Sequence, residues 1–216
     1  MNTSIIKGKS TGTILFIHGN SSSNKVFESV LNSELIQQTK IVVDLPGHGN
    51  SVDDYKNHSN FSIQFFKEKL LEFIKTIDDD ILLVGNSLGG HLAIEISDQV
   101  KNLKGLVIFG TPPVKKPLNL EEAFLPENPT EQEIIKAVEV AIANAKSSKI
   151  ITEDFKKTNP KVRKCIANDI LENRLLNEYE IYKNLEVPKF ILAGDKDPSV
   201  NLEYVKELNK ISQNSN

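Results

Sequence analysis

Five short apolar runs, spread over most of the chain, constrain its fold more than any other feature. Each run is continuous rather than alternating, and the set is rich in β-branched residues. Strands buried on both faces of a parallel sheet have this pattern. The sequence therefore predicts an α/β protein built on a mostly parallel open sheet. The five predicted strands span residues 13–17, 41–43, 81–84, 106–109 and 190–193.

Helical patterns between the first four strands predict right-handed crossovers, with helices on both faces of the sheet. Residues 60–77 and 87–100 both place apolar side chains at helical spacing. Between the fourth and fifth strands the alternation stops, because this span holds several helical patterns and no strand candidate. We expect a helical cap, residues 111–186, inserted in a core formed by residues 1–110 and 187–216.

The composition is that of an ordinary globular domain. The 216 residues can bury a substantial core, and the net charge of −3 argues against nucleic-acid binding, which needs a basic face. Apolar runs of four or five residues are too short to span a bilayer, and no leader-like segment opens the chain. We therefore expect no nucleic-acid partner, no membrane span and a cytoplasmic location, whereas the oligomeric state is not readable.

Cofactor chemistry has no signature in the sequence. The single cysteine, Cys165, cannot form an internal disulfide framework, and we expect it to be an inert, partly buried thiol. Histidine and cysteine do not cluster at metal-ligand spacing, and the segment Gly47-His48-Gly49 is not a phosphate loop. We expect neither a metal nor a cofactor.

The sharpest functional signal is a G-x-S-x-G sequence at residues 85–89, which follows a predicted strand and opens a predicted helix. In a nucleophile elbow, this strand–turn–helix setting raises a serine hydroxyl above the sheet. The turn strains the serine backbone, and glycines on either side leave room for the crossing chains. We therefore predict that Ser87 attacks the substrate and that Gly85 and Gly89 form the elbow. The simpler alternative is a Gly-Ser turn that caps a helix.

Two loops near this turn complete a family pattern. The segment His18-Gly19-Asn20 follows the first predicted strand, and a D-x-P-G-x-G-x-S segment, residues 44–51, follows the second. With the elbow, these segments resemble the α/β-hydrolase superfamily, in its cap-bearing branch of small esterases, lipase-like enzymes and C–C hydrolases. The resemblance covers about residues 13–210, and the cap is its least specific part.

The resemblance implies roles for residues in these segments. The backbone N–H groups of Asn20 and Leu88 would form the oxyanion hole. The segment at 194–198, Gly-Asp-Lys-Asp-Pro, looks like the family's G-x-x-D-P stretch, which makes Asp197 the acid that orients a catalytic histidine, with Asp195 as the runner-up. Asp44 and His48 would be scaffold.

The catalytic histidine is missing from the expected place. Triad order in this fold is serine, acid, histidine, but no histidine follows Asp197 in this sequence. We expect His18 to order its loop through backbone hydrogen bonds, His58 to be exposed, and His91 to point away from the elbow. The chain is then either an incomplete copy of an α/β hydrolase, shortened at its C-terminus, or a complete chain that has lost the chemistry. The intact pattern up to Asp197 favours the former.

These observations predict a serine hydrolase that cleaves an ester or similar acyl bond of a small to medium, largely apolar substrate. Ser87 would attack the carbonyl, the oxyanion hole would hold the developing charge, and an Asp197-oriented histidine would move the proton. Two alternatives stay open at this point: a non-catalytic ligand-binding protein on the same scaffold, and an acyltransferase. A haloalkane-dehalogenase-like reaction is disfavoured, because it needs a carboxylate in place of the serine.

Overall fold

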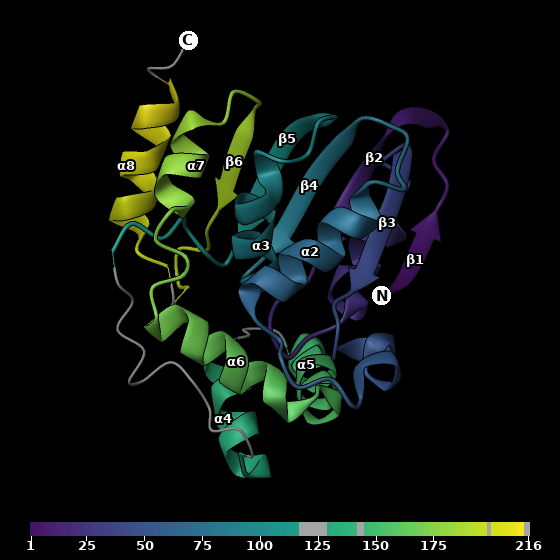
Figure 1. The fold of residues 1–216 in the computed structure, drawn as a ribbon, viewed down its shortest axis with the longest axis vertical. Coiled ribbons are helices and arrows are strands. Elements are labelled where there is room, and N and C mark those ends of the chain that lie inside the picture. The colour runs from purple at the N-terminus through teal and green to yellow at the C-terminus, as the bar shows by residue number, and fades with distance from the viewer. Residues whose placement is uncertain (117–128, 142–144, 198–199, 214–216) are drawn as a thin grey trace.

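A six-stranded sheet forms the centre of the computed structural model, which describes residues 1–116, 129–141, 145–197 and 200–213. The strand order is β1-β3-β2-β4-β5-β6, and all neighbours are parallel except β1 and β3 (Figure 1). The predicted, mostly parallel open sheet is confirmed. Its strands are β1 Asn2–Ile6, β2 Ser10–Ile17, β3 Gln38–Asp44, β4 Ile81–Asn86, β5 Leu103–Phe109 and β6 Lys189–Leu192.

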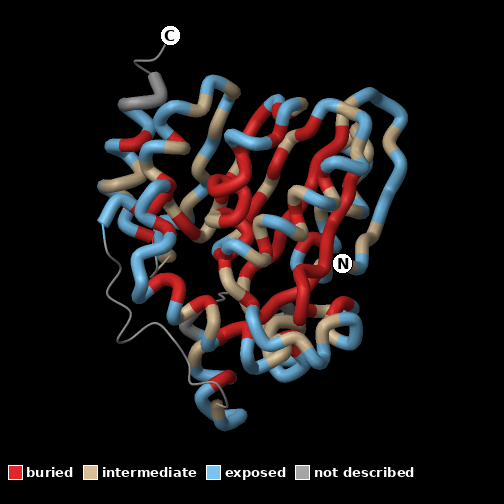
Figure 2. Tube along the Cα trace, viewed as in Figure 1, coloured by how far each residue is buried: buried red, intermediate tan, exposed pale blue. Residues whose placement is uncertain are grey.

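Both faces of the sheet are covered, because successive side chains of a strand point to opposite faces. Leu15 and Ile17 of β2 join the larger core cluster, which also holds the buried apolar side chains of α2 (Ile63–Ile74) and α3 (Leu88–Ser97). Ile14 and Phe16 pack on the other face with Phe27, beside the short helix α1 (Glu28–Leu31). Figure 2 shows the buried positions concentrated on the central strands. The prediction of helices on both faces is therefore confirmed.

The helix α2 follows the predicted amphipathic pattern but is shorter than expected. Ser62 caps its first turn by accepting a hydrogen bond from the backbone N–H of Phe65, at 3.2 Å. Phe73 and Ile77 are only partly buried. The helix ends at Ile74, so Ile77 lies beyond its last turn. The residues that it buries are Ile63, Phe66, Leu70 and Ile74.

Between β5 and β6 the described residues form only helices and irregular segments. A capping box opens α4: the N–H of Thr130 donates to Glu133 Oε2 at 2.7 Å, and the N–H of Glu133 donates to Thr130 Oγ1 at 3.3 Å. In Figure 1, α4, α5 and α6 lie beyond the carboxyl ends of the parallel strands, whereas α7 packs against α3. The sequence did not predict α5 or α8. The bounds are α4 Glu131–Ala141, α5 Ala145–Lys157, α6 Pro160–Leu171, α7 Glu178–Asn184 and α8 Leu202–Gln213.

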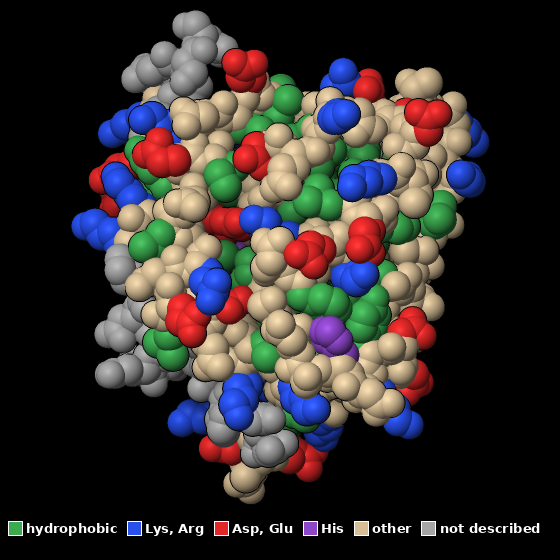
Figure 3. Space-filling model, viewed as in Figure 1, with side chains coloured by type: hydrophobic (Ala, Val, Ile, Leu, Met, Phe, Trp, Pro, Cys, Tyr) green, Lys and Arg blue, Asp and Glu red, His purple; other side chains and the backbone are tan. Residues whose placement is uncertain are grey.

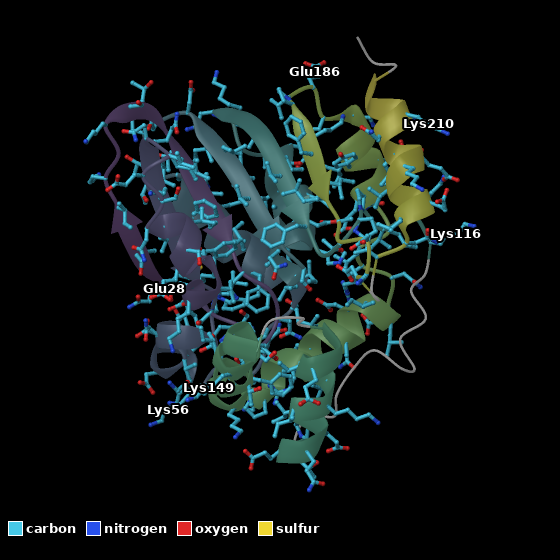
Figure 4. All side chains as sticks on the ribbon, turned by 180° about the vertical axis from the view of Figure 1, so that it is seen from behind. Glu28, Lys56, Lys116, Lys149, Glu186 and Lys210 are labelled. Atoms are coloured by element: carbon cyan, nitrogen blue, oxygen red, sulfur yellow. The ribbon has the colours of Figure 1, made fainter. Side chains whose placement is uncertain are left out.

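The sheet ends on an exposed edge. Within the described sheet β6 pairs with β5 alone, and two of its apolar side chains, Phe190 and Leu192, are about 60% exposed. On the face in Figure 3, cationic and anionic side chains are interspersed. Figure 4 shows Lys116 and Lys210 at the outer edge of the molecule, on the side of α8. None of the described helices is both long and apolar enough to cross a bilayer.

Candidate active site

Ser87 occupies a strained turn between β4 and α3. Its backbone dihedrals are φ +49° and ψ −118°, a conformation that non-glycine residues rarely adopt, and the residue is exposed. The N–H of Ser87 donates to the carbonyl of Phe109 on β5 at 2.9 Å, while the carbonyl of Ser87 accepts from Gly90 and His91. The neighbouring strand and the first turn of α3 thus hold the strained residue from both sides.

Two glycines allow the chains to cross at this turn. A Cβ on Gly85 would lie 2.3 Å from the carbonyl oxygen of Gly89. A Cβ on Gly89 would lie 2.1 Å from the carbonyl oxygen of Ile17, at the end of β2. Both distances are far inside van der Waals contact with backbone atoms that cannot rotate away. Side chains larger than hydrogen are therefore excluded from these two positions.

The loop after β2 passes directly beside the serine. A Cβ on Gly19 would lie 3.2 Å from the Cβ of Ser87, so the two backbones are in close contact. Asn20 and Leu88 line the same cavity as Ser87. Leu88 is the first residue of α3, where free N–H groups and the helix dipole favour negative charge. The fold thus brings together the serine and both residues predicted to hold an oxyanion.

A cavity of about 940 Å³ opens above Ser87. Its floor is formed by the elbow and the loop after β2, and its roof by helices α4 to α6. The roof is largely apolar, so the cavity can hold a medium-sized acyl group. Its apolar lining residues include Val138, Ile151, Phe155, Ile166, Ile170 and Leu175.

The two candidate acids are separated by the structure. Asp197 lines the cavity together with Ser87, whereas Asp195 is exposed and is not among the lining residues. The N–H of Asp197 donates to the carbonyl of Gly194 at 3.3 Å, which closes the turn after β6. Pro198, the last residue of the predicted motif, lies outside the described residues. Of the two candidate acids, only Asp197 therefore lies at the cavity.

His18 orders its loop, as predicted from the sequence. The ring is fully buried; its Nδ1 lies 2.7 Å from the carbonyl oxygen of Gly19, and its Nε2 accepts from the N–H of Leu45 at 3.0 Å. This pairing requires the proton on Nδ1. Burial lowers the pKa of His18, although the bond to Gly19 and nearby carboxylates oppose that shift. His18 is thus a neutral ring that shapes the loop beside Ser87.

The loop after β3 is organised around Asp44. One carboxylate oxygen accepts from the N–H of Asn24 at 2.7 Å, and the other accepts from the N–H of Asn50 at 2.9 Å. His48 is buried, and its Nδ1 bonds to the carbonyl of Pro46 at 3.0 Å. Burial, reinforced by the neighbouring His18, lowers the pKa of His48 well below its usual value. Both residues therefore serve as scaffold in this structure.

His91 does not point away from the site, contrary to the sequence-based expectation. It lines the cavity with Ser87, and its Nδ1 lies 2.9 Å from both carboxylate oxygens of Glu178. Its Nε2 lies 2.7 Å from Thr111 Oγ1, and Glu178 also accepts from the N–H of Val114. The tilt of helical side chains toward the N-terminus returns His91 to the elbow side.

The buried contact with Glu178 sets the protonation of His91. Burial alone lowers the pKa of His91, but the carboxylate of Glu178, with a smaller contribution from Glu95, outweighs it and leaves the pKa raised. Burial raises the pKa of the Glu178 carboxyl, whereas His91 and the Val114 N–H lower it in part. The imidazolium is therefore stabilised in the fold. Sequence reasoning missed this pair, because its members lie 87 residues apart and carry no shared local pattern.

The fourth histidine is also engaged elsewhere. His58 is half-buried rather than exposed, because its ring stacks on Phe65 with centroids 4.2 Å apart. All four histidines lie within the described residues, and none of their rings has a hydrogen bond to the Ser87 hydroxyl there. In the same part of the chain, no three His, Cys, Asp or Glu side chains gather as they would around a metal ion.

Solved structures of known enzymes share this fold. The N-acyl homoserine lactonase AidH, in complex with N-hexanoyl homoserine lactone, is 23% identical, with a TM-score of 0.81 over 95% of this chain and 79% of its own. Another enzyme that degrades N-acyl homoserine lactones is 19% identical, with a TM-score of 0.74 over 97% and 84%. A carboxylesterase from Nitrososphaera gargenis is 14% identical, with a TM-score of 0.71 over 97% and 81%. A search of curated protein sequences gave no match.

The parallel sheet and the strained serine between β4 and α3 together define the α/β-hydrolase fold. The sequence profile described as the alpha/beta hydrolase family matches residues 14–212, which is most of the chain. The chain belongs to the alpha/beta hydrolase family.

The first prediction concerns the elbow. Replacing Gly89 by alanine should lower the free energy of unfolding by at least about 2–3 kcal/mol, because the new Cβ meets the Ile17 carbonyl at 2.1 Å. The matched control is Gly194→Ala, whose Cβ has no neighbour closer than 3.8 Å and should change stability by less than about 0.5 kcal/mol. Urea unfolding followed by far-ultraviolet circular dichroism measures the free energy of unfolding of both variants. Equal stability of the two variants would contradict the close backbone contact between Gly89 and Ile17.

The second prediction concerns His91. Its pKa, followed by NMR titration of the ring Cε1–H, should lie above 6.5. In Glu178→Gln the pKa should fall below 6.5, because burial lowers it and the Glu178 carboxylate no longer raises it. Because folding raises this pKa, the stabilisation by the pair is complete below pH 6.5 and is lost as the pH rises through the folded pKa. The other three histidines serve as internal controls. A His91 pKa that is unchanged by Glu178→Gln would contradict the pairing.

Proposed function

We propose that this protein is a serine hydrolase that cleaves an ester, or a similar acyl bond, with Ser87 as its nucleophile. The observation that carries the proposal is the strained backbone of Ser87 at the floor of a largely apolar cavity. Strain of this kind is retained where a fixed side-chain position is needed. A plain helix cap does not account for it, because the Ser87 side chain makes no capping hydrogen bond to α3.

The chemistry would proceed by acyl transfer to the serine. Ser87 Oγ attacks the substrate carbonyl, its proton passes to a base, and the N–H groups of Asn20 and Leu88 stabilise the oxyanion. The tetrahedral intermediate collapses, and the leaving alcohol takes up the proton. A water molecule then attacks the acyl-serine by the same route, which releases the acid and restores Ser87. Asp197 would orient the base.

No histidine ring of the described chain is hydrogen-bonded to the Ser87 hydroxyl, where the general base would act. Each of the four histidine rings has other partners among the described residues. An enzyme of this kind without its base retains a rate of roughly 10³-fold over water from the oxyanion hole and binding. We therefore expect the 216-residue chain to turn over esters slowly.

The substrate class follows from the cavity and from the related structures. The apolar roof suits a small to medium acyl group, and a lactone is a cyclic ester, so the lactonases and the carboxylesterase both act on acyl–oxygen bonds. Helices α4 to α6 would act as the cap over the site. Acyl transfer to an alcohol would use the same residues. The cytoplasmic location expected from the sequence stays a prediction.

A second candidate function is ligand binding without catalysis. The observation that favours it is the absence of a hydrogen bond between the Ser87 hydroxyl and the ring of any of the four histidines, all of which are described. The cavity of about 940 Å³ is large enough to hold a ligand in either case. Catalysis that depends on Ser87 separates the two functions.

Chemical rescue tests the proposal. With p-nitrophenyl butyrate, the protein should show slow hydrolysis that Ser87→Ala removes, and added imidazole should raise the Ser87-dependent rate by roughly tenfold or more by acting as the base. Ser59→Ala, at an exposed loop serine, should behave like the unaltered protein. Imidazole also hydrolyses the ester directly, so the rate with Ser87→Ala is subtracted at each concentration. Equal rates for the protein and Ser87→Ala at every concentration would leave binding without catalysis as the function.

A further inference from the structure

Three side chains form a hydrogen-bonded chain in the wall of the cavity that holds Ser87. Thr111 Oγ1 lies 2.7 Å from His91 Nε2, and His91 Nδ1 lies 2.9 Å from both carboxylate oxygens of Glu178. Thr111 and His91 line the cavity, whereas Glu178 is fully buried and is not among the lining residues. In a chain of hydroxyl, imidazole and carboxylate, the imidazole can accept a proton from the hydroxyl while the carboxylate orients the ring.

The partners of His91 determine which ring nitrogen accepts a proton. An ionised carboxylate has no hydrogen to donate, so Nδ1 carries a proton and donates it to Glu178. Nε2 of the neutral ring is then an acceptor, and the Thr111 hydroxyl donates to it. When Nε2 is protonated it donates to Thr111 Oγ1, whose own proton turns to the carbonyl of Pro112, 3.3 Å away. The contacts therefore accommodate His91 in both protonation states.

The Thr111 side chain packs against the turn of α3 that begins at Ser87. A Cβ on Gly90 would lie 2.6 Å from Thr111 Cγ2, so the methyl group of Thr111 covers the backbone there. The N–H of Ser87 donates to the carbonyl of Phe109, two residues before Thr111. The carbonyl of Ser87 accepts from the N–H of His91 at 3.1 Å. These contacts hold Ser87, Thr111 and His91 in fixed positions around one cavity.

Thr111 is better placed to pass on a proton than to attack a substrate. It is 5% exposed, whereas Ser87 is exposed at its strained turn. A buried hydroxyl on a branched side chain is hard for a substrate carbonyl to approach. A hydroxyl both donates and accepts, so it can lose one proton while it gains another. The position of Thr111 therefore suits a link between the cavity and His91.

The charges that face His91 come from three helices. Burial lowers the pKa of His91, and Glu178 on α7 and Glu95 on α3 raise it. Lys67 on α2 pairs with Glu95 at 2.7 Å and offsets part of its charge. Glu178 is therefore the acid whose removal should shift the pKa of His91 most. The other acids that line the cavity are Asp197, Glu203 and Glu207.

We infer that Thr111 and His91 form the path by which the Ser87 hydroxyl loses its proton, and that Glu178 positions His91 in this path. As Ser87 Oγ bonds to the substrate carbonyl carbon, its proton passes to Thr111 Oγ1, directly or through one water molecule. The proton that Thr111 already carried moves to His91 Nε2, so Thr111 stays a neutral hydroxyl and His91 becomes an imidazolium. The same transfers in reverse protonate the leaving alcohol as its bond to the carbonyl carbon breaks.

The inference rests on the proposed function, because it names a proton acceptor for Ser87. The path is indirect, since it passes through a second hydroxyl before it reaches the ring. It is therefore consistent with slow turnover by this chain, and a base in direct contact with Ser87 would act faster.

Two substitutions that differ in the hydroxyl test the inference with p-nitrophenyl butyrate, the rate with Ser87→Ala being subtracted throughout. Thr111→Val keeps the branched shape without the hydroxyl and should lower the Ser87-dependent rate at least about tenfold. Thr111→Ser keeps the hydroxyl and should retain most of the rate. Thr76→Val, at an exposed threonine, is the matched control and should have no effect. Saturating imidazole should bring the rates of the two Thr111 variants together, because an added base bypasses the path.

The pH dependence of the same rate identifies His91 and requires no change at Thr111. Because His91 must be neutral to accept a proton, the Ser87-dependent rate should rise with pH through the folded pKa of His91, which lies above 6.5. The midpoint should equal the pKa of His91 measured by NMR. In Glu178→Gln both values should move below 6.5 together. Titration of Asp197, Glu203 or Glu207 would not produce this joint shift.

Three results would overturn the inference while leaving Ser87 as the nucleophile. The first is an equal Ser87-dependent rate in Thr111→Val and Thr111→Ser. The second is a loss in Thr111→Val that imidazole does not restore, which would make Thr111 a packing residue. The third is a pH midpoint that does not follow the pKa of His91, a result that does not require either Thr111 variant to fold. If the protein is no faster than Ser87→Ala, the proposed function fails and the inference fails with it.

Discussion

The structure depends on one close crossing of backbones, where the end of β2, the end of β4 and the start of α3 meet. Gly85 and Gly89 permit this crossing, because a Cβ at either position would lie within 2.3 Å of a carbonyl oxygen. The crossing forces Ser87 into its strained conformation and brings the loop after β2 beside it. The floor of the cavity, and the predicted oxyanion donors with it, follow from this one constraint.

Two polar contacts join helices that follow β5 to the elements around Ser87. The ion pair between His91 and Glu178 joins α3 to α7, so the elbow helix is fixed to an element that follows the roof helices in the chain. Arg163 links α6 to the loop after β2 through Ser21. Buried polar contacts of this kind are sensitive to the loss of either partner. These contacts therefore fix α7 to the elbow helix and α6 to the loop after β2.

Local patterns predicted the sheet and the elbow, and tertiary contacts account for what they missed. Buried parallel strands and a G-x-S-x-G turn each have a signature within a few residues, so five of the six strands were found, and Ser87 lies at the turn as expected. Asp197 lines the cavity and Asp195 does not, and the choice of Asp197 as the acid stays a prediction. His91 was expected to point away from the elbow, because no local sequence pattern indicates its contact with Glu178.

The central claim is that Ser87 is the reactive nucleophile of this cavity. The most direct measurement is covalent trapping with diethyl p-nitrophenyl phosphate, followed by intact mass and peptide sequencing by mass spectrometry. Ser87 Oγ would form a bond to phosphorus as p-nitrophenolate leaves, so the account predicts a single diethylphosphoryl group on Ser87 and none on the Ser87→Ala protein. An adduct on Thr111, equal labelling of Ser87→Ala, or no labelling at all would contradict the claim.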